Sequence, residues 1–113
     1  MEIRIIKEPI KKQELTEMAK KQFGDIIKAV VDIEKEIMAI GPELHSDGEI
    51  LLEEKEGSKR EYVWGINLYP EQDDFIEFDS VINLKPSSNN RSRDVENPDI
   101  REKIKQIVNK LII

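Results

Sequence analysis

Four polar residues, Asn67, Glu77, Asp79 and Asn83, are predicted to share one face of a β-hairpin. Two carboxylates two positions apart on a strand point the same way and lie about 7 Å apart. At that separation they could hold one hydrated divalent cation or share a proton through water. The alternative is structural, since an antiparallel sheet with one solvated face carries polar side chains there. The four residues are therefore candidate ligand-binding residues, or simply the solvated face of a sheet.

The hairpin is predicted from two segments, 62–69 and 75–84, in which apolar and polar residues alternate. Such alternation is typical of strands that bury one face. The register expected from the turn between them pairs Asn67 with Glu77. On the same face, Gly65 has no side chain and would leave room for a ligand. The apolar face of both segments is predicted to enter the core.

A second cluster, Glu43, His45 and Asp47, combines two carboxylates with the only histidine of the chain. These side chains could give two or three ligands to Mg²⁺, Mn²⁺ or Zn²⁺, and the many oxygens favour Mg²⁺ or Mn²⁺. The spacing matches no compact metal motif, and no other cofactor is predicted. The alternative is helix capping, because Ser46 and Glu49 have the S-x-x-E spacing of a capping box.

A polar stretch, residues 85–99, carries two of the five arginines of the chain, Arg91 and Arg93. In an extended loop the two guanidinium groups could form a fork for a phosphate or carboxylate. The alternative is an exposed loop in which they pair with neighbouring carboxylates. Because this loop follows the strand that bears Asp79, its arginines could fold back over the polar sheet face. The sequence thus predicts either an ion-pair network or an anion site.

Composition limits the function classes. The chain has 113 residues, which suits one domain spanning 1–113, and its formal net charge is −6. An acidic protein is a poor match for nucleic acid or anionic membranes. There is no cysteine, which excludes disulfides and thiolate sites.

No signal peptide or membrane-spanning run is evident, so a cytoplasmic location is expected. Eighteen isoleucines would suit a thermophile or a compositionally biased genome.

The remaining elements follow from hydrophobic periodicity and capping residues. Residues 25–41 suit a helix or a β-hairpin, and their β-branched content favours the hairpin. The sequence predicts an α+β fold in the order β-α-β-β-α-β-β-α: a mostly antiparallel sheet of about five strands, covered on one face by helices. The other expected elements are a strand at 2–6 and helices at 11–24, 46–57 and from Pro98, which Asn97 caps.

Three stretches carry a resemblance to a known family: FGDIIKAVVDIEKEIMAIGPELHSDGE, WGINLYP and IEFDSVINLKPSSNNRSRDVENPDIREKI. The chain resembles a family of short prokaryotic proteins catalogued only as a domain of unknown function, over residues 3–111. Relatives tend to carry glycine in place of Glu36, which supports a turn there, and a second glycine in place of Pro42. The resemblance implies one intact domain. It brings no catalytic residues with it.

These observations lead to three functional hypotheses. The first is a binding module for a partner protein or a small anionic ligand. The second is a metal-dependent phosphoester hydrolase, in which the sheet carboxylates hold the ion and Arg91 and Arg93 neutralise phosphate charge. The third is a homodimer joined through the edge strand at 2–6. No recurring catalytic motif is present to favour an enzyme.

Overall fold

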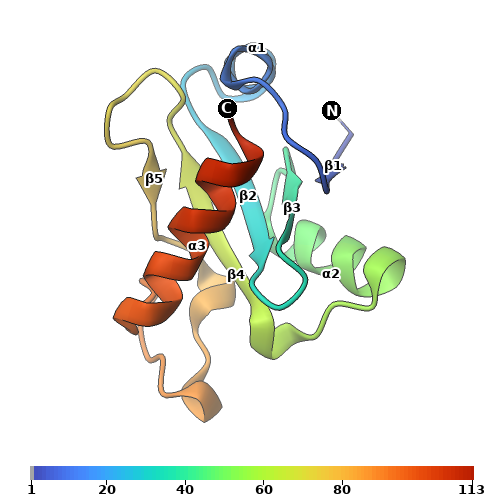
Figure 1. Ribbon diagram of the computed structural model, residues 1–113. Coiled ribbons are helices and arrows are strands. Elements are labelled where there is room, and N and C mark those ends of the chain that lie inside the picture. The colour runs from blue at the N-terminus through green and yellow to red at the C-terminus, as the bar shows by residue number, and fades with distance from the viewer. Residues whose placement is uncertain (1) are drawn as a thin grey trace.

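The computed structural model describes residues 2–113, and a five-stranded antiparallel sheet forms its centre (Figure 1). The strands lie in the order β1-β3-β2-β4-β5. They are β1 (Arg4–Ile6), β2 (Ile27–Asp32), β3 (Ile37–Ile40), β4 (Val63–Leu68) and β5 (Ile76–Glu77). The helices are α1 (Lys12–Gln22), α2 (His45–Glu56) and α3 (Pro98–Leu111). The predicted α+β class, the five antiparallel strands and their order along the chain are confirmed.

Helices cover both faces of the sheet. The apolar stripes of α1 and α3 pack on one face and form the larger core with β2 and β4. α2 lies on the opposite face (Figure 1), where Leu52 packs with Val30 and Val63. Gly48 allows this close approach, because a Cβ at that position would lie 2.8 Å from Val30. The sequence predicted helices on one face only; the structure differs because β2 and β3 are buried on both faces.

Residues 25–41 form the β2–β3 hairpin, as the sequence favoured. Asp32 shapes its turn, since Oδ1 accepts the backbone N–H groups of Glu34 and Lys35 at 2.9 and 3.0 Å. Glu36 then adopts a φ of 57°, a left-handed conformation that glycine adopts at lower cost. A glycine at this position, which the resemblance implies for relatives, would suit this turn.

The start of α2 differs from the predicted capping box. The helix begins at His45, and its N-cap is Leu44, whose side chain makes no capping bond within residues 2–113. Ser46 therefore does not cap the helix. Glu49 is buried, with its Oε1 3.6 Å from Nε of Arg60, and burial raises the pKa of its carboxyl. The capping prediction is wrong, and the first backbone N–H groups of α2 have no side-chain acceptor there.

The second strand of the predicted 62–84 hairpin is only two residues long. β4 and β5 pair in the predicted register at Asn67 and Glu77, but the chain then leaves the sheet. It forms a 3-10 turn at Val81–Asn83. Leu84, predicted to be core, is 46% exposed. Strand alternation beyond residue 77 was therefore misleading, because this apolar pattern belongs to a turn that packs against the sheet edge.

Asn83 takes the place of the missing strand residues at the edge of β4. Its Oδ1 accepts the N–H of Gly65 at 2.8 Å, and its Nδ2 donates to the carbonyl of Gly65 at 2.9 Å. The same Nδ2 donates to the carbonyl of Arg93 at 2.9 Å. The side chain is fully buried. Asn83 thus satisfies the backbone of β4 and ties the 79–83 segment to the sheet.

Candidate functional site

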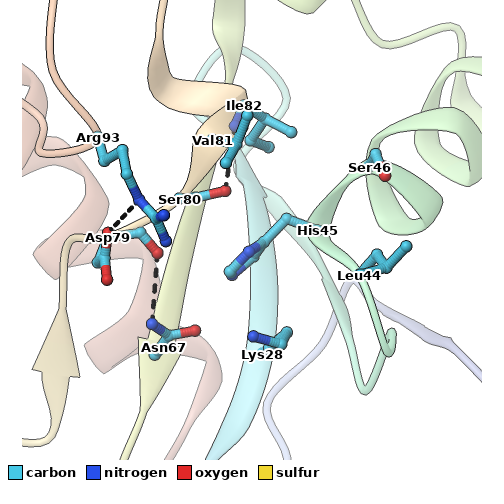
Figure 2. A pocket seen from close by; sticks show the side chains of 10 residues that line it. All are labelled: Lys28, Leu44, His45, Ser46, Asn67, Asp79, Ser80, Val81, Ile82 and Arg93. Carbon is cyan, nitrogen blue, oxygen red and sulfur yellow. Dashed lines mark hydrogen bonds and ion pairs between the residues drawn. The ribbon is translucent and has the colours of Figure 1, made fainter.

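A pocket of about 290 Å³ lies between the start of α2, the sheet and the segment 79–82 (Figure 2). β2 and β4 each contribute one polar side chain, Lys28 and Asn67, which are partners in the strand register. Figure 2 shows Asp79 and Arg93 on the opposite side of His45 from the α2 helix. The polar part of the lining comprises Lys28, His45, Ser46, Asn67, Asp79, Ser80 and Arg93.

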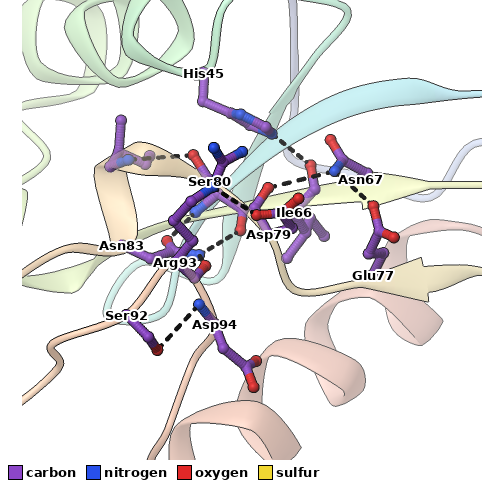
Figure 3. Close-up of polar contacts among 12 residues, drawn as sticks. His45, Ile66, Asn67, Glu77, Asp79, Ser80, Asn83, Ser92, Arg93 and Asp94 are labelled. Carbon is purple, nitrogen blue, oxygen red and sulfur yellow. Dashed lines mark hydrogen bonds and ion pairs between the residues drawn. The ribbon is translucent and has the colours of Figure 1, made fainter.

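Asn67 has a buried side chain with one unused acceptor. Its Nδ2 donates to Oε1 of Glu77 at 2.9 Å and to the carbonyl of Asp79 at 3.3 Å (Figure 3). Both partners are acceptors, so the orientation of the amide is fixed. Its Oδ1 has no hydrogen-bond partner among the described residues, although Asn67 is only 5% exposed. Figure 2 shows this oxygen turned away from Asp79, toward the side where Lys28 lies.

Arg93 is held at the pocket by one carboxylate. Its Nε donates to Oδ1 of Asp79 at 2.7 Å, and both side chains are about half exposed. This contact uses one of the five N–H donors of the guanidinium group. The Nη groups have no partner within the part of the chain that the structure describes. Arg93 is therefore oriented by Asp79 and keeps donors for a ligand.

His45 lines the pocket between Arg93 and the α2 helix (Figure 2). It is buried, and its Nε2 lies 2.8 Å from the backbone carbonyl of Ile66 (Figure 3). A carbonyl only accepts, so Nε2 carries a proton and Nδ1 of the neutral ring does not. Burial lowers the pKa of His45, and the nearby ammonium of Lys28 lowers it further. The neutral imidazole is therefore the stable form at neutral pH.

The first turn of α2 adds a further positive element. Leu44, His45 and Ser46 are the N-cap and the first two residues of this 12-residue helix, and all three line the pocket. Aligned peptide dipoles give a helix N-terminus partial positive charge, and its first N–H groups have no partner inside the helix. With Lys28 and Arg93, the helix start makes this pocket cationic. Asp79, already paired, is the only carboxylate in its lining.

Lowering the pH below 6.5 is expected to reduce the stability of the protein through His45. The pKa of this ring in the folded protein is lowered from its ordinary value of 6.5. As the pH falls below 6.5, the unfolded chain therefore takes up a proton more readily than the folded protein, which favours unfolding. The free energy of unfolding should therefore fall progressively as the pH is lowered below about 6.5. Lys28 and Asp79 face the ring and act in opposite directions on its pKa.

Urea unfolding of the wild type and of His45→Gln checks this expectation. The glutamine amide can still donate to Ile66, yet it does not titrate. Glu49, whose pKa is raised, contributes with the opposite sign in both proteins, so the difference between them isolates His45. Equal pH dependence in the two proteins would show that His45 titrates normally.

The structure brings together four residues from the three clusters that the sequence had defined. Asn67, Asp79, Arg93 and His45 line one pocket. Arg91 does not line it, so the two arginines form no fork. Glu77 lies just outside, where Oε1 accepts from Asn67 and from the Tyr69 hydroxyl. The predicted site residues outside the lining are Glu43, Asp47, Glu77, Asn83 and Arg91.

Sequence reasoning missed Lys28 and Ser80. Lys28 is the one charged residue in the apolar run from Ile26 to Val31, and that interruption was an available signal. Ser80 is buried and packs against the backbone of Gly65. The sequence offers no signal for Ser80, because this contact depends on the chain leaving the sheet after β5.

The metal cluster predicted at Glu43, His45 and Asp47 does not converge. Glu43 and Asp47 are exposed, whereas His45 is buried and bonded to the backbone. Across residues 2–113, no group of three histidine or carboxylate side chains is placed to hold a metal ion. Asp79 is also committed to Arg93. The geometry therefore gives the hydrolase hypothesis no specific support.

The fold and the pocket define a small α+β protein with a polar, cationic site between a helix N-terminus and a sheet. Residues 4–111 match the family described as Protein of unknown function (DUF5674), and the chain belongs to this family. The resemblance found in the sequence is thereby confirmed as a family of unknown function. No curated protein and no solved structure matches the chain.

Other sequence predictions remain predictions: prokaryotic and thermophilic origin, cytoplasmic location, and the homodimer. None of the helices formed by residues 2–113 is long and apolar enough to cross a bilayer.

Proposed function

We propose that this protein binds a small organic anion, bearing a carboxylate or phosphate group, in the pocket between α2 and the sheet. The observation that carries the proposal is the gathering of Lys28, Arg93 and the uncapped start of α2 around one cavity. A solvated sheet face explains isolated polar side chains. It does not explain cationic groups converging on a cavity that also holds an unused buried acceptor.

Charge favours an anionic ligand. The chain as a whole has a net charge of −6, so cations gathered around a single pocket stand out against an acidic background. Two side-chain cations face one carboxylate in the lining, and His45 is neutral. In a partly enclosed site such charges act more strongly than on an open surface. A bound anion would neutralise the excess positive charge.

The residues have distinct roles in this proposal. Arg93 offers planar Nη donors that suit a carboxylate or phosphate, and Asp79 fixes its orientation. Lys28 contributes a second charge from β2. Ser46 and Ser80 bring hydroxyl donors, and the first N–H groups of α2 complete the set. His45 holds the helix start against β4.

Replacing Arg93 with glutamine is expected to weaken anion binding about tenfold to a hundredfold, because hydrogen bonds to a charged group are lost. Melting curves of the protein with increasing 4-methylpentanoate or inorganic phosphate measure the effect. A ligand that binds only the folded state raises the melting temperature saturably. Arg91→Gln is the matched control, since it makes the same change two residues away and outside the lining.

General salt and exclusion effects stabilise all three proteins alike. A rise that Arg93→Gln shares fully with the wild type and with Arg91→Gln would therefore contradict binding in this pocket. No saturable rise with either anion would contradict the proposed function itself.

A further inference from the structure

A second cavity, of about 390 Å³, lies beside the loop that follows the 79–83 segment. Two cationic side chains line it: Lys85 from that loop, and Arg60 from the turn after α2. The serine residues Ser87 and Ser88 complete its polar lining on the loop side. This cavity shares no lining residue with the pocket between α2 and the sheet, so the two are separate sites.

Lys85 is a buried lysine without an ion-pair partner. Only 6% of the residue is exposed. Its Nζ donates to the carbonyl of Ile82 at 3.0 Å and lies 5.0 Å from the centre of the Trp64 ring. Within residues 2–113, no carboxylate forms an ion pair with it. A buried lysine usually has such a partner, because removing an ammonium group from water is costly. The environment of Lys85 therefore favours the neutral amine more than solvent does.

The charges around Lys85 add to this effect. Burial lowers the pKa of its amine, the carboxyl of Glu49 acts in the opposite direction, and the guanidinium group of Arg60 lowers the pKa further. Glu49 is itself buried, and burial raises the pKa of its carboxyl, which weakens its support for the ammonium form. The face of Trp64 attracts a cation, but a neutral ring does not replace a carboxylate. Desolvation and a neighbouring cation are the two features that make a lysine nucleophilic near neutral pH.

We propose that Lys85 forms a Schiff base with a small carbonyl compound that bears a carboxylate, as a 2-oxo acid does. The unprotonated Nζ attacks the carbonyl carbon and forms a C–N bond. The carbonyl oxygen then leaves as water with both hydrogens of the amine, and a C=N bond remains. Arg60 selects the carboxylate, because its planar donors suit that group and it lines the same cavity. This reactivity is independent of the anion pocket.

Reductive trapping tests the reactivity of Lys85. Glyoxylate, the smallest 2-oxo acid, is added at neutral pH with cyanoborohydride, which reduces a Schiff base to a stable secondary amine. Peptide mass spectrometry then follows each lysine over time. Lys85 should be modified about threefold to tenfold faster than Lys105, an exposed lysine on α3. Its rate should also level off at a lower pH. A rate at Lys85 no higher than that at Lys105, or the same pH profile for both, would overturn the proposal.

Two variants test the role of Arg60. Arg60→Gln removes the guanidinium group, and Lys59→Gln is the matched control, since it removes one positive charge at an exposed position outside the lining. Arg60→Gln should slow the modification of Lys85 by glyoxylate about tenfold, and slow the reaction with acetaldehyde, which has no carboxylate, by less. Lys59→Gln should leave both rates close to those of the wild type. Equal slowing with the two aldehydes, or no slowing in Arg60→Gln, would overturn the choice of a carboxylate-bearing compound.

Discussion

Replacing Asn83 with alanine is expected to lower the free energy of unfolding by about 3 kcal/mol. The side chain is fully buried and makes three hydrogen bonds, two to the backbone of Gly65 and one to the carbonyl of Arg93. Alanine would leave these backbone groups without partners at the edge of β4. The cost is large because buried groups lose their bonds without regaining water.

Urea denaturation of Asn83→Ala measures this loss, with Asn109→Ala as the control. Asn109 is exposed on α3, where alanine is a better helix former, so its replacement should be neutral or slightly stabilising. A loss below about 1 kcal/mol in Asn83→Ala would show that the 79–83 segment is not anchored to β4 in this way.

Replacing Gly65 with alanine is expected to destabilise the protein by about 2–3 kcal/mol and to disrupt the pocket. An added Cβ would lie 2.5 Å from Cβ and from Oγ of Ser80, and 3.1 Å from Cδ2 of His45. Both neighbours line the pocket, and neither is at the end of a long flexible side chain. The alanine methyl group would therefore push the 79–83 segment away from β4 and displace His45.

A double-mutant cycle with Ser80→Gly separates this contact from other effects. Ser80→Gly alone removes the bond from Ile82 N–H to Oγ and should destabilise the protein. If the clash is the cause, Gly65→Ala should cost about 1–2 kcal/mol less in the Ser80→Gly background. Additive costs would show that the strain in Gly65→Ala lies elsewhere.

Much of the fold followed from local pattern in the sequence. Apolar–polar alternation predicted β4, and β-branched content favoured the β2–β3 hairpin over a helix. Asn97 with Pro98 marked the start of α3, where Oδ1 of Asn97 accepts from Asp99 N–H at 2.8 Å. These signals succeed because each depends on neighbours in the chain. The strand that was predicted to continue beyond Glu77 does not form, for a physical reason. Asn83 offers the edge of β4 the same donor and acceptor as a strand, and alternation does not reveal this substitution.

The pocket could be predicted only in part. Asp79 and Arg93 were expected to meet, because the loop that carries Arg93 follows the segment of Asp79. His45 was predicted to be a metal ligand because it is a histidine between two carboxylates. The sequence did not show that α2 begins at His45 and turns the ring toward β4. Lys28 joins the site through strand pairing with Asn67, which lies 39 positions further along the chain. Such long-range contacts need tertiary structure.

The NMR signals of the single histidine ring give the most direct test of an anion site in this pocket. Titration with 4-methylpentanoate or phosphate should shift the His45 ring signals saturably in the wild type and in Arg91→Gln, and much less in Arg93→Gln. The bound anion should also raise the pKa of His45, because a neighbouring negative charge favours the imidazolium form. Ring signals and a pKa that stay unchanged while the anion raises the melting temperature would place binding elsewhere and contradict the account.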